Sequence, residues 1–287
     1  MIPAAIQEIQ IAHSPDSDDA FMFYGLATGK IKVPGYKFTH NLTDIETLNQ
    51  RALKDAFYDV TAISFHAYPY LQDNYALMSA GSSMGEGYGP MLVAARKIGA
   101  RTLKPSDLGK LRIAVPGTMT TAYLTLKLFA PEVQARVVDF DKITAAVASG
   151  EYDAGLLIHE GQLTYGNDGL HKILDLGQWW RTETGLPLPL GGNAIKRSLG
   201  PEVMLTTAHA IRDSIRYGLN NRDLALQYAM QFARDLDPNL ANRYVGMYVN
   251  ERTIDMGNDG REAIRRILAM GYERGIIPIE AKVDFVG

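Results

Sequence analysis

The first third of the chain alternates between short apolar runs and segments in which apolar residues recur every three or four positions. The runs at residues 9–13, 36–40 and 60–64 predict strands, and the segments at 20–28 and 44–55 predict helices. Turn-forming and helix-capping residues stand between them. A helix between each pair of successive strands is typical of a mainly parallel, doubly wound sheet.

The middle of the chain repeats this order. Residues 111–115, 136–139 and 155–158 predict strands, and residues 120–129 and 141–149 predict helices. The two blocks share a rhythm but no clear sequence repeat. They predict two modest α/β domains rather than one large core.

The last third differs from both blocks, because residues 201–275 predict helices almost throughout. Two α/β blocks with a helical tail match the layout of two-lobed solute-binding proteins, in which the chain builds one lobe, crosses to the second and returns. We therefore assign residues 1–95 and 192–287 to lobe 1 and residues 96–191 to lobe 2. Ligands in such folds bind at the carboxyl ends of strands, so we expect a cleft between the lobes.

The composition narrows the partners and the chemistry. Net charge is −3 and no basic block is present, so nucleic acid is not an expected partner. The absence of cysteine excludes disulfides, thiolate catalysis and cysteine-ligated metals. No run approaches the ~20 apolar residues of a membrane span, and the acidic residues within 1–21 do not predict a signal peptide. We expect a cytoplasmic protein.

A Pro-Gly turn leads into Thr118, Thr120 and Thr121 at the start of a predicted helix. Free backbone N–H groups and the helix dipole favour an anion there, and threonine hydroxyls add donors. The spacing lacks the Gly-x-x-x-x-Gly-Lys pattern of a nucleotide-binding loop, so a carboxylate fits better than a triphosphate. The plainer interpretation is that Thr118 or Thr120 only caps the helix.

His159 ends the apolar run at residues 154–158 and is followed by Glu160. An imidazole titrates near neutral pH, and a histidine at the carboxyl end of a strand can act as a general base or acid. The alternative is a structural histidine that hydrogen-bonds to the backbone.

Ser64 ends another predicted strand and is followed closely by His66. Ser64 can donate its hydroxyl or its backbone N–H to a ligand, whereas a histidine such as His66 more often serves the start of a helix. No Gly-x-Ser-x-Gly sequence surrounds Ser64, which argues against a Ser-His-acid triad with His159.

Asp16, Asp18 and Asp19 form an acidic cluster after the first predicted strand. Their spacing does not match an EF-hand loop, so we expect helix capping rather than a metal site. Zinc is not expected either, because no i, i+4 pair occurs among the other histidines. These are His13, His40, His171 and His209.

Trp179 and Trp180 precede a segment rich in proline, leucine and glycine at residues 185–192. Aromatic side chains there can wall an apolar ligand, or they can fill the core of the second lobe.

Four patches of the sequence belong together. They are Ser14-Pro15 with Asp19 and Phe21-Met22-Phe23-Tyr24; Asp44-Ile45-Glu46-Thr47-Leu48-Asn49; Val115-Pro116-Gly117 with Thr120-Thr121-Ala122-Tyr123; and Gly155-Leu156-Leu157-Ile158-His159-Glu160 with Asp175-Leu176-Gly177, Trp179-Trp180 and Gly185-Leu186-Pro187-Leu188-Pro189-Leu190-Gly191. In this order, over nearly the whole chain, they resemble the 1,4-dihydroxy-6-naphthoate synthase family, the lyase of the futalosine route to menaquinone. The last patch is the most specific.

The resemblance implies an α/β, periplasmic-binding-protein-like (type II) fold in which each lobe is a mainly parallel mixed sheet flanked by helices. It also implies cleavage of cyclic dehypoxanthine futalosine to 1,4-dihydroxy-6-naphthoate and dihydroxyacetone. A small carboxylated substrate is the expected partner, with no metal or organic cofactor. His159 matches the family's catalytic base. The other matching positions are substrate-binding ones: Ala62, Ile63 and Ser64, Thr120 and Thr121, and Asp19 of the first loop.

Two places depart from the family pattern. The first loop of the family commonly reads Ser-Pro-Cys-Pro-Asn-Asp-Thr, whereas here it reads Ser14-Pro15-Asp16-Ser17-Asp18-Asp19-Ala20, with Asp16 and Asp18 as added aspartates. Gly161 also stands where serine is common. An added carboxylate beside a carboxylated ligand lowers affinity unless it is solvated or protonated. The exact substrate is therefore open, and one alternative is a paralogue whose acidic first loop selects another ligand. Two other functions are also kept open, a non-catalytic carboxylate-binding protein of the same fold and a chorismate dehydratase-like enzyme. The oligomeric state is equally open, a homodimer included.

Overall fold

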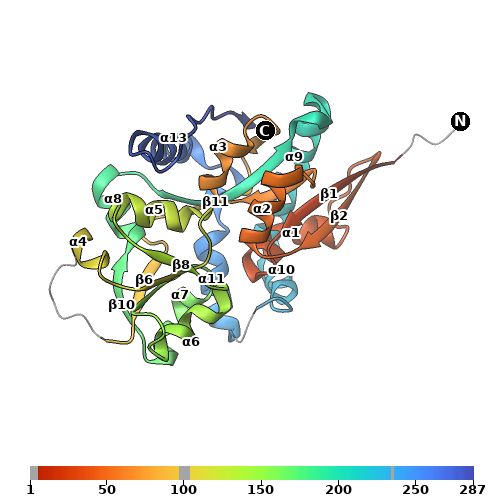
Figure 1. Cartoon of the computed structure of the whole chain (residues 1–287). Helices are drawn as coiled ribbons and strands as arrows, with labels where there is room; N and C mark the ends of the chain where they lie inside the picture. Colours follow the sequence, from red (N-terminus) through yellow and green to blue (C-terminus); the bar gives the residue numbers. More distant parts are fainter. Residues whose placement is uncertain (1–5, 97–103, 234–235) are drawn as a thin grey trace, which may run out of the picture. The chain divides into compact units, whose positions relative to one another are not determined.

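The computed structural model describes residues 6–96, 104–233 and 236–287. By its internal contacts the chain divides into two compact units, each with its own sheet and helices (Figure 1). Unit 1 comprises Met1–Met84, Gly191–Asn258 and Ala281–Gly287, and unit 2 comprises Gly85–Leu190 and Asp259–Glu280.

Unit 1 is built on a seven-stranded mixed sheet. Its order is β12 (Phe285–Val286), β4 (Tyr75–Met78), β11 (Leu188–Lys196), β3 (Val60–Ile63), β1 (Gln7–His13) and β2 (Tyr36–Leu42), with β5 (Ser83–Gly85) also paired to β11. β1 runs parallel to β2 and β3, whereas β11 runs antiparallel to β3 and β4. The carboxyl ends of β1, β2 and β3 therefore lie at one edge of this sheet.

Helices α1 (Ser17–Ala27) and α9 (Pro201–Asn220) pack closely in unit 1. Gly25 permits this approach, because a Cβ there would lie 3.1 Å from the Cα of Ser214. The Ser214 hydroxyl donates to the Met22 carbonyl at 3.0 Å, so this buried polar group is satisfied within the contact. The remaining described helical segments of unit 1 are α2 (Ile45–Asp55), η1 (Phe65–Ala67), α3 (Tyr68–Leu71), η4 (Arg197–Leu199), α10 (Arg222–Ala229), α11 (Pro238–Tyr248) and α12 (Glu251–Ile254).

Unit 2 is built on a five-stranded sheet. Its order is β10 (His171–Asp175), β6 (Met91–Ala94), β9 (Ala154–Leu157), β7 (Ile113–Val115) and β8 (Ala135–Val137). β7 runs parallel to both β8 and β9, and β6 runs antiparallel to β9 and β10. The carboxyl ends of β7, β8, β9 and β10 therefore share one edge.

Helices cover both faces of this sheet. Figure 1 shows α5 (Thr121–Phe129) and α8 (Leu176–Thr184) on one side and α6 (Ile143–Ala148) on the other. Successive strand residues point to opposite faces, which produces two cores. The first core contains Leu92, Ile113, Val115, Leu126, Leu156 and Leu176, and the second contains Met91, Val93, Ala114, Ile143, Val147 and Leu157. The other described helical segments are α4 (Pro105–Leu108), η2 (Phe140–Lys142), α7 (Gly161–Thr164), η3 (Tyr165–Asp168) and α13 (Gly257–Glu273).

The predicted alternation of strands and helices is confirmed in both units, and the tail is helical within the described residues; residues 234–235 lie outside them. The first helix begins at Ser17 rather than at residue 20, because Asp18 and Asp19 form part of its first turn. The short strands β4, β5, β6 and β12 were not predicted, because runs of two to four residues are too short to show a period.

The two units divide the chain differently from the predicted lobes. Residues 85–95 belong with unit 2, because β6 pairs with β9 and β10. Residues 259–280 also belong with unit 2, where a Cβ at Gly271 would lie 3.1 Å from Leu124 of α5. The chain returns to unit 1 at Gly191. The cleft between lobes stays a prediction.

Across residues 6–96, 104–233 and 236–287, no helix has both the length and the apolar composition that a membrane span requires.

Candidate active site

The carboxyl edge of the unit 2 sheet brings two predicted site segments to the same place. β7 and β9 are parallel neighbours, with Ile113 opposite Ala154 and Ala114 opposite Gly155. Thr120 follows β7 after the Pro-Gly turn, and His159 follows β9. Both therefore lie at the edge of an α/β sheet where ligands usually bind.

His159 has a left-handed backbone, with a φ of 61°. In the described part of the chain, Ala56 is the only other non-glycine residue with a positive φ. This conformation costs an L-residue roughly 1 kcal/mol or more, and it is found disproportionately at functional sites. The bend ends β9 and leads into α7, where the Gln162 N–H donates to the His159 carbonyl at 3.1 Å. By this criterion His159 is a candidate functional residue.

The half-buried imidazole of His159 meets an aromatic ring. The centroids of the Phe140 and His159 rings are 5.0 Å apart, and the ring planes cross at 61°, an edge-to-face arrangement. Phe140 opens η2, which follows β8 at the same edge of the sheet. The sequence interpretation did not identify Phe140, since an aromatic residue after a short strand has no distinguishing pattern.

Thr120 caps α5, as the plainer interpretation of the sequence predicted. Its Oγ accepts a hydrogen bond from the Tyr123 N–H at 3.1 Å and donates to the Gly117 carbonyl at 2.9 Å. Thr120 and Thr121 are both buried. Because the Thr120 hydroxyl is engaged on both sides, the helix start offers an anion its backbone N–H groups and dipole rather than this hydroxyl.

Ser64 follows β3 at the carboxyl edge of the unit 1 sheet, and Asn49 of α2 holds it there. The Ser64 N–H donates to Asn49 Oδ1 at 2.9 Å, and Asn49 Nδ2 lies 3.1 Å from Ser64 Oγ. The amide nitrogen can only donate, so Ser64 Oγ is the acceptor and its hydroxyl hydrogen points elsewhere. Ile63 is fully buried and Ala62 half-buried, so Ile63 can offer a ligand only its backbone. Asn49 was missed because nothing in the helical pattern distinguishes it.

The acidic first loop is folded onto itself. Asp19 Oδ2 accepts from the Ser14 N–H at 2.7 Å, and Asp16 Oδ2 accepts from the Ser14 hydroxyl at 2.9 Å. Asp16 occupies the N-cap position of α1 but makes no side-chain capping bond, so the capping predicted for the cluster is wrong for this residue. Asp18 and Asp19 lie in the first turn, where negative charge complements the helix dipole.

Two histidines, His13 which is buried and His40 which is half-buried, lie beside this loop. His13 Nδ1 is 3.0 Å from the Ser14 carbonyl, and His13 Nε2 is 3.1 Å from His40 Nδ1. A carbonyl can only accept, so His13 carries its proton on Nδ1, and His40 Nδ1–H must donate to His13 Nε2. Burial lowers the pKa of both rings to about 4. Phe23 stacks on His13 with centroids 4.4 Å apart.

The tryptophan pair serves the interior of unit 2, one of the two roles left open by the sequence. Trp180 is fully buried, and its indole N–H donates to the Pro187 carbonyl at 2.9 Å. Trp179 meets Phe129 of α5 edge to face. Their contacts are those of core side chains.

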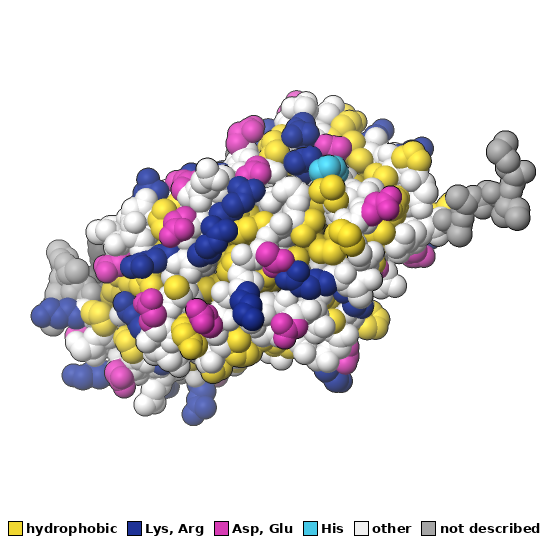
Figure 2. Space-filling view, turned by 90° about the horizontal axis from the view of Figure 1, so that it is seen from above, with side chains coloured by type: hydrophobic (Ala, Val, Ile, Leu, Met, Phe, Trp, Pro, Cys, Tyr) yellow, Lys and Arg dark blue, Asp and Glu magenta, His cyan; other side chains and the backbone are white. Residues whose placement is uncertain are grey.

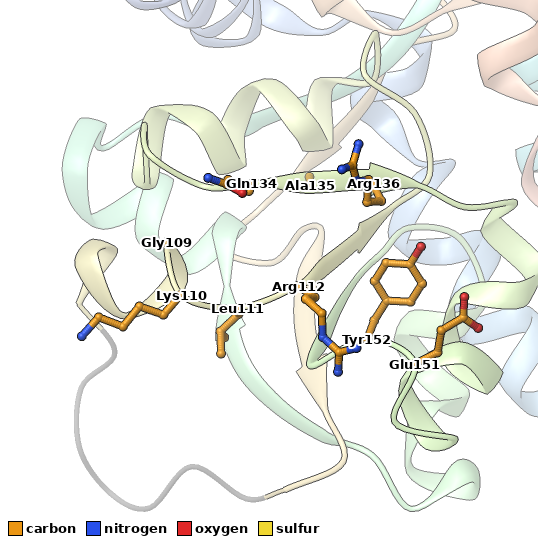
Figure 3. Close-up of a pocket in the computed structure, with 9 residues that line it drawn as sticks. All are labelled: Gly109, Lys110, Leu111, Arg112, Gln134, Ala135, Arg136, Glu151 and Tyr152. Atoms are coloured by element: carbon orange, nitrogen blue, oxygen red, sulfur yellow. The ribbon is translucent and has the colours of Figure 1, made fainter.

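A surface hollow of about 700 Å³ lies at the opposite edge of the unit 2 sheet (Figure 3). Its residues precede β7 and β9 or lie at the start of β8, and none of them is a predicted site residue. Arg112 is committed to Asp153, with hydrogen bonds of 2.9 and 3.1 Å, and Lys110 and Arg136 point in different directions in Figure 3. The lining residues are Gly109, Lys110, Leu111, Arg112, Gln134, Ala135, Arg136, Glu151 and Tyr152.

Charge is mixed on the surface. On the face drawn in Figure 2, acidic and basic side chains are interspersed, in line with the sequence's lack of a basic block. Among the residues that the structure describes, no group of three or more histidine, aspartate or glutamate side chains is arranged to hold a metal ion.

Two curated proteins are similar to the chain over almost its full length. The 1,4-dihydroxy-6-naphtoate synthase of Streptomyces coelicolor is 38% identical over 277 residues, which cover 94% of this chain and 95% of that protein. The protein of the same name from Thermus thermophilus is 37% identical over 281 residues, covering 98% of this chain and all of that one.

Solved structures agree on the fold. A crystal structure of an Archaeoglobus fulgidus protein has a TM-score of 0.88 and 46% identity, and the match covers 94% of this chain and 98% of that one. The alkanesulfonate-binding protein SsuA from Xanthomonas axonopodis has a TM-score of 0.70 at 14% identity, with 98% and 97% covered, so it shows the periplasmic-binding-protein-like fold alone. A sequence model described as "Menaquinone biosynthesis" matches residues 9–273. With two curated synthases more than 35% identical along nearly its whole length, the chain belongs to the menaquinone biosynthesis family.

Proposed function

We propose that the chain is a cytoplasmic carbon–carbon lyase that cleaves cyclic dehypoxanthine futalosine to 1,4-dihydroxy-6-naphthoate and dihydroxyacetone. His159 acts as the general base. It takes a proton from a substrate hydroxyl or activated carbon and so starts a retro-aldol-like release, a contribution worth ~10²–10⁴-fold in rate. The names of the two curated relatives support the product.

One observation carries the assignment of the base. His159 holds a strained left-handed backbone at the end of β9, at the sheet edge that also carries the start of α5. Strain of this kind persists only where the surrounding structure enforces it, and strained residues cluster at active sites. The start of α5 supplies the complementary feature, because its N–H groups and dipole favour the substrate carboxylate.

The proposal gives each remaining predicted residue a role set by its surroundings. Ser64 donates its hydroxyl hydrogen to a substrate oxygen, because its Oγ already accepts a hydrogen bond from Asn49 Nδ2. Ala62 and Ile63 contribute backbone groups, and Thr121 joins the carboxylate-binding helix start. Asp19 acts indirectly by fixing the Ser14 N–H in the first loop.

Incubation with cyclic dehypoxanthine futalosine, followed by chromatography for dihydroxynaphthoate, tests the function. The wild type and His171→Asn, which changes an exposed histidine of unit 2, are expected to form product, and His159→Asn is expected to form none. Wild-type turnover by His159→Asn would refute the mechanism. A substrate-induced rise in melting temperature without product would instead favour a binding protein, and turnover of chorismate would favour a dehydratase.

A further inference from the structure

Phe140 reaches the edge that carries His159 by way of β8. The pairing of β8 with β7 continues to Val138, whose N–H donates to the Val115 carbonyl at 3.0 Å. Two residues later Phe140 opens η2, and η2 leads directly into α6. The place of α6 on the sheet therefore decides where Phe140 lies.

Gly155 of β9 sets the place of α6. A Cβ at Gly155 would lie 2.5 Å from Ile143 Cγ2 and 2.8 Å from Val147 Cγ2, closer than side-chain atoms approach one another. Because Gly155 has no side chain, α6 can lie directly on β9. Gly155 is four residues before His159 in the chain. The approach brings Phe140 into edge-to-face contact with the imidazole, with the centroids 5.0 Å apart.

We propose that Phe140 is a positioning residue for His159, and that its ring selects the imidazole rotamer that meets the substrate. The proposal rests on the proposed function, in which His159 is the base. The left-handed backbone of His159 fixes the direction of its Cβ but leaves the two side-chain torsions to the neighbours. An edge-to-face pair of rings changes the population of one rotamer about fivefold. Phe140 acts on the imidazole and takes no part in proton transfer.

Three variants separate this role from general packing. Phe140→Leu removes the ring but keeps an apolar side chain, and Phe140→Tyr keeps the ring. Phe129→Leu is the matched control, because it removes another edge-to-face contact of unit 2, with Trp179 at 5.5 Å. We expect Phe140→Leu to lower kcat about 5- to 10-fold with KM within about twofold of wild type. Phe140→Tyr and Phe129→Leu are expected to keep kcat within about twofold.

Nuclear magnetic resonance tests the contact without substrate. The ring protons of His159, assigned by their loss in His159→Asn, are expected to shift in Phe140→Leu and to stay near their wild-type positions in Phe140→Tyr and Phe129→Leu. Phe140→Met replaces Phe140→Leu if the latter does not fold. Unchanged His159 signals together with an unchanged kcat in Phe140→Leu would overturn the proposal. An inactive wild type with the predicted shifts would refute the proposed lyase function but support the positioning of His159.

Discussion

At His159 the backbone conformation and the residue type work against each other, and stability measurements can detect this. All variants at this position lose the contact with Phe140, so differences among them report the left-handed backbone. Asparagine tolerates this region, whereas valine, with its branched Cβ, does not. We expect His159→Asn to be about 0.5–1 kcal/mol more stable than His159→Ala and His159→Val to be the least stable, as measured by urea unfolding. Equal stabilities would mean that the bend is unstrained.

The pair of buried His13 and half-buried His40 makes stability depend on pH. In the folded protein both pKa values are lowered to about 4 by burial, whereas in the unfolded chain they return to about 6.5. Between about pH 4 and pH 6.5, unfolding therefore lets both imidazoles take up protons. The contribution of each ring to stability is complete above pH 6.5 and is lost as pH falls toward 4, by up to ~1.4 kcal/mol per pH unit.

Urea unfolding at pH 7 and pH 5 checks this prediction. The wild type is expected to lose stability between the two, and the double variant His13→Gln/His40→Gln to lose much less. The double variant His171→Gln/His209→Gln changes two exposed histidines and should keep the wild-type dependence. An identical pH dependence in all three proteins would contradict the assignment.

Several residue-level features were within reach of the sequence, and others were not. The capping of α2 by Asp44, whose Oδ1 accepts from the Thr47 N–H at 3.0 Å, follows from local sequence alone. The left-handed φ of His159 does not follow from local sequence, and neither does the role of the Ser64 hydroxyl as an acceptor from Asn49. Each depends on groups that the sheet brings together. The same holds for the contact between Phe140 and His159.

At the scale of elements, the close packing of α6 on β9 depends on one glycine, Gly155, which has no side chain. Gly155→Ala would place a Cβ against Ile143 and Val147 and push α6 outward. We expect a loss of about 1–3 kcal/mol in unfolding free energy, as for other overpacked cores, and a fall in turnover through the displacement of Phe140. Gly166→Ala, where a Cβ meets nothing within 4 Å, is the control and should stay within about 0.5 kcal/mol of wild type. A fully stable Gly155→Ala would show that α6 can move without cost.

Hydrophobic periodicity predicted several of the longer elements, because a strand or helix of seven or more residues can show its buried face in sequence. β1, α2 and α5 are of this kind. β4 and β6 are buried at all four positions and show no alternation. Their pairing, rather than any property of their own residues, makes them strands.

At the scale of the whole molecule, the end of the chain is tied to distant segments of unit 1. Arg197 donates to both carboxylate oxygens of Asp284 at 2.6 and 2.8 Å, and the Tyr68 hydroxyl donates to the same group at 2.8 Å. The hydrogen bonds from Arg197 hold the pKa of Asp284 below its usual value. These contacts hold the segment that leads into β12.

Removing either partner of this pair should loosen the end of the chain. We expect Arg197→Gln and Asp284→Asn each to lower the free energy of unfolding by about 0.5–1 kcal/mol, because the pair is partly exposed. The double variant should lose no more than the larger single effect. Asp213→Asn, in the exposed Arg216–Asp213 pair, is expected to change stability by less than about 0.5 kcal/mol. Fully additive losses would show that the two side chains act separately.

The division into units was the feature least accessible from sequence. The predicted boundary at residues 95–96 falls between a strand and its partners in the same sheet, since β6 pairs with β9 and β10. The helical pattern of α13 is clear, but its assignment to unit 2 depends on a contact with α5 far earlier in the chain. Amphipathic periodicity identifies a helix without identifying the surface that it covers.

The chain passes between the two units four times, at Met84/Gly85, Leu190/Gly191, Asn258/Asp259 and Glu280/Ala281. During synthesis, unit 2 lacks α13 until residue 273 has been added, and unit 1 lacks β12 until residues 285–286 have been added. Unit 2 therefore cannot be completed before residue 273 is synthesised, and unit 1 cannot be completed before residues 285–286 are. Truncation just before residue 285 would leave unit 1 without β12.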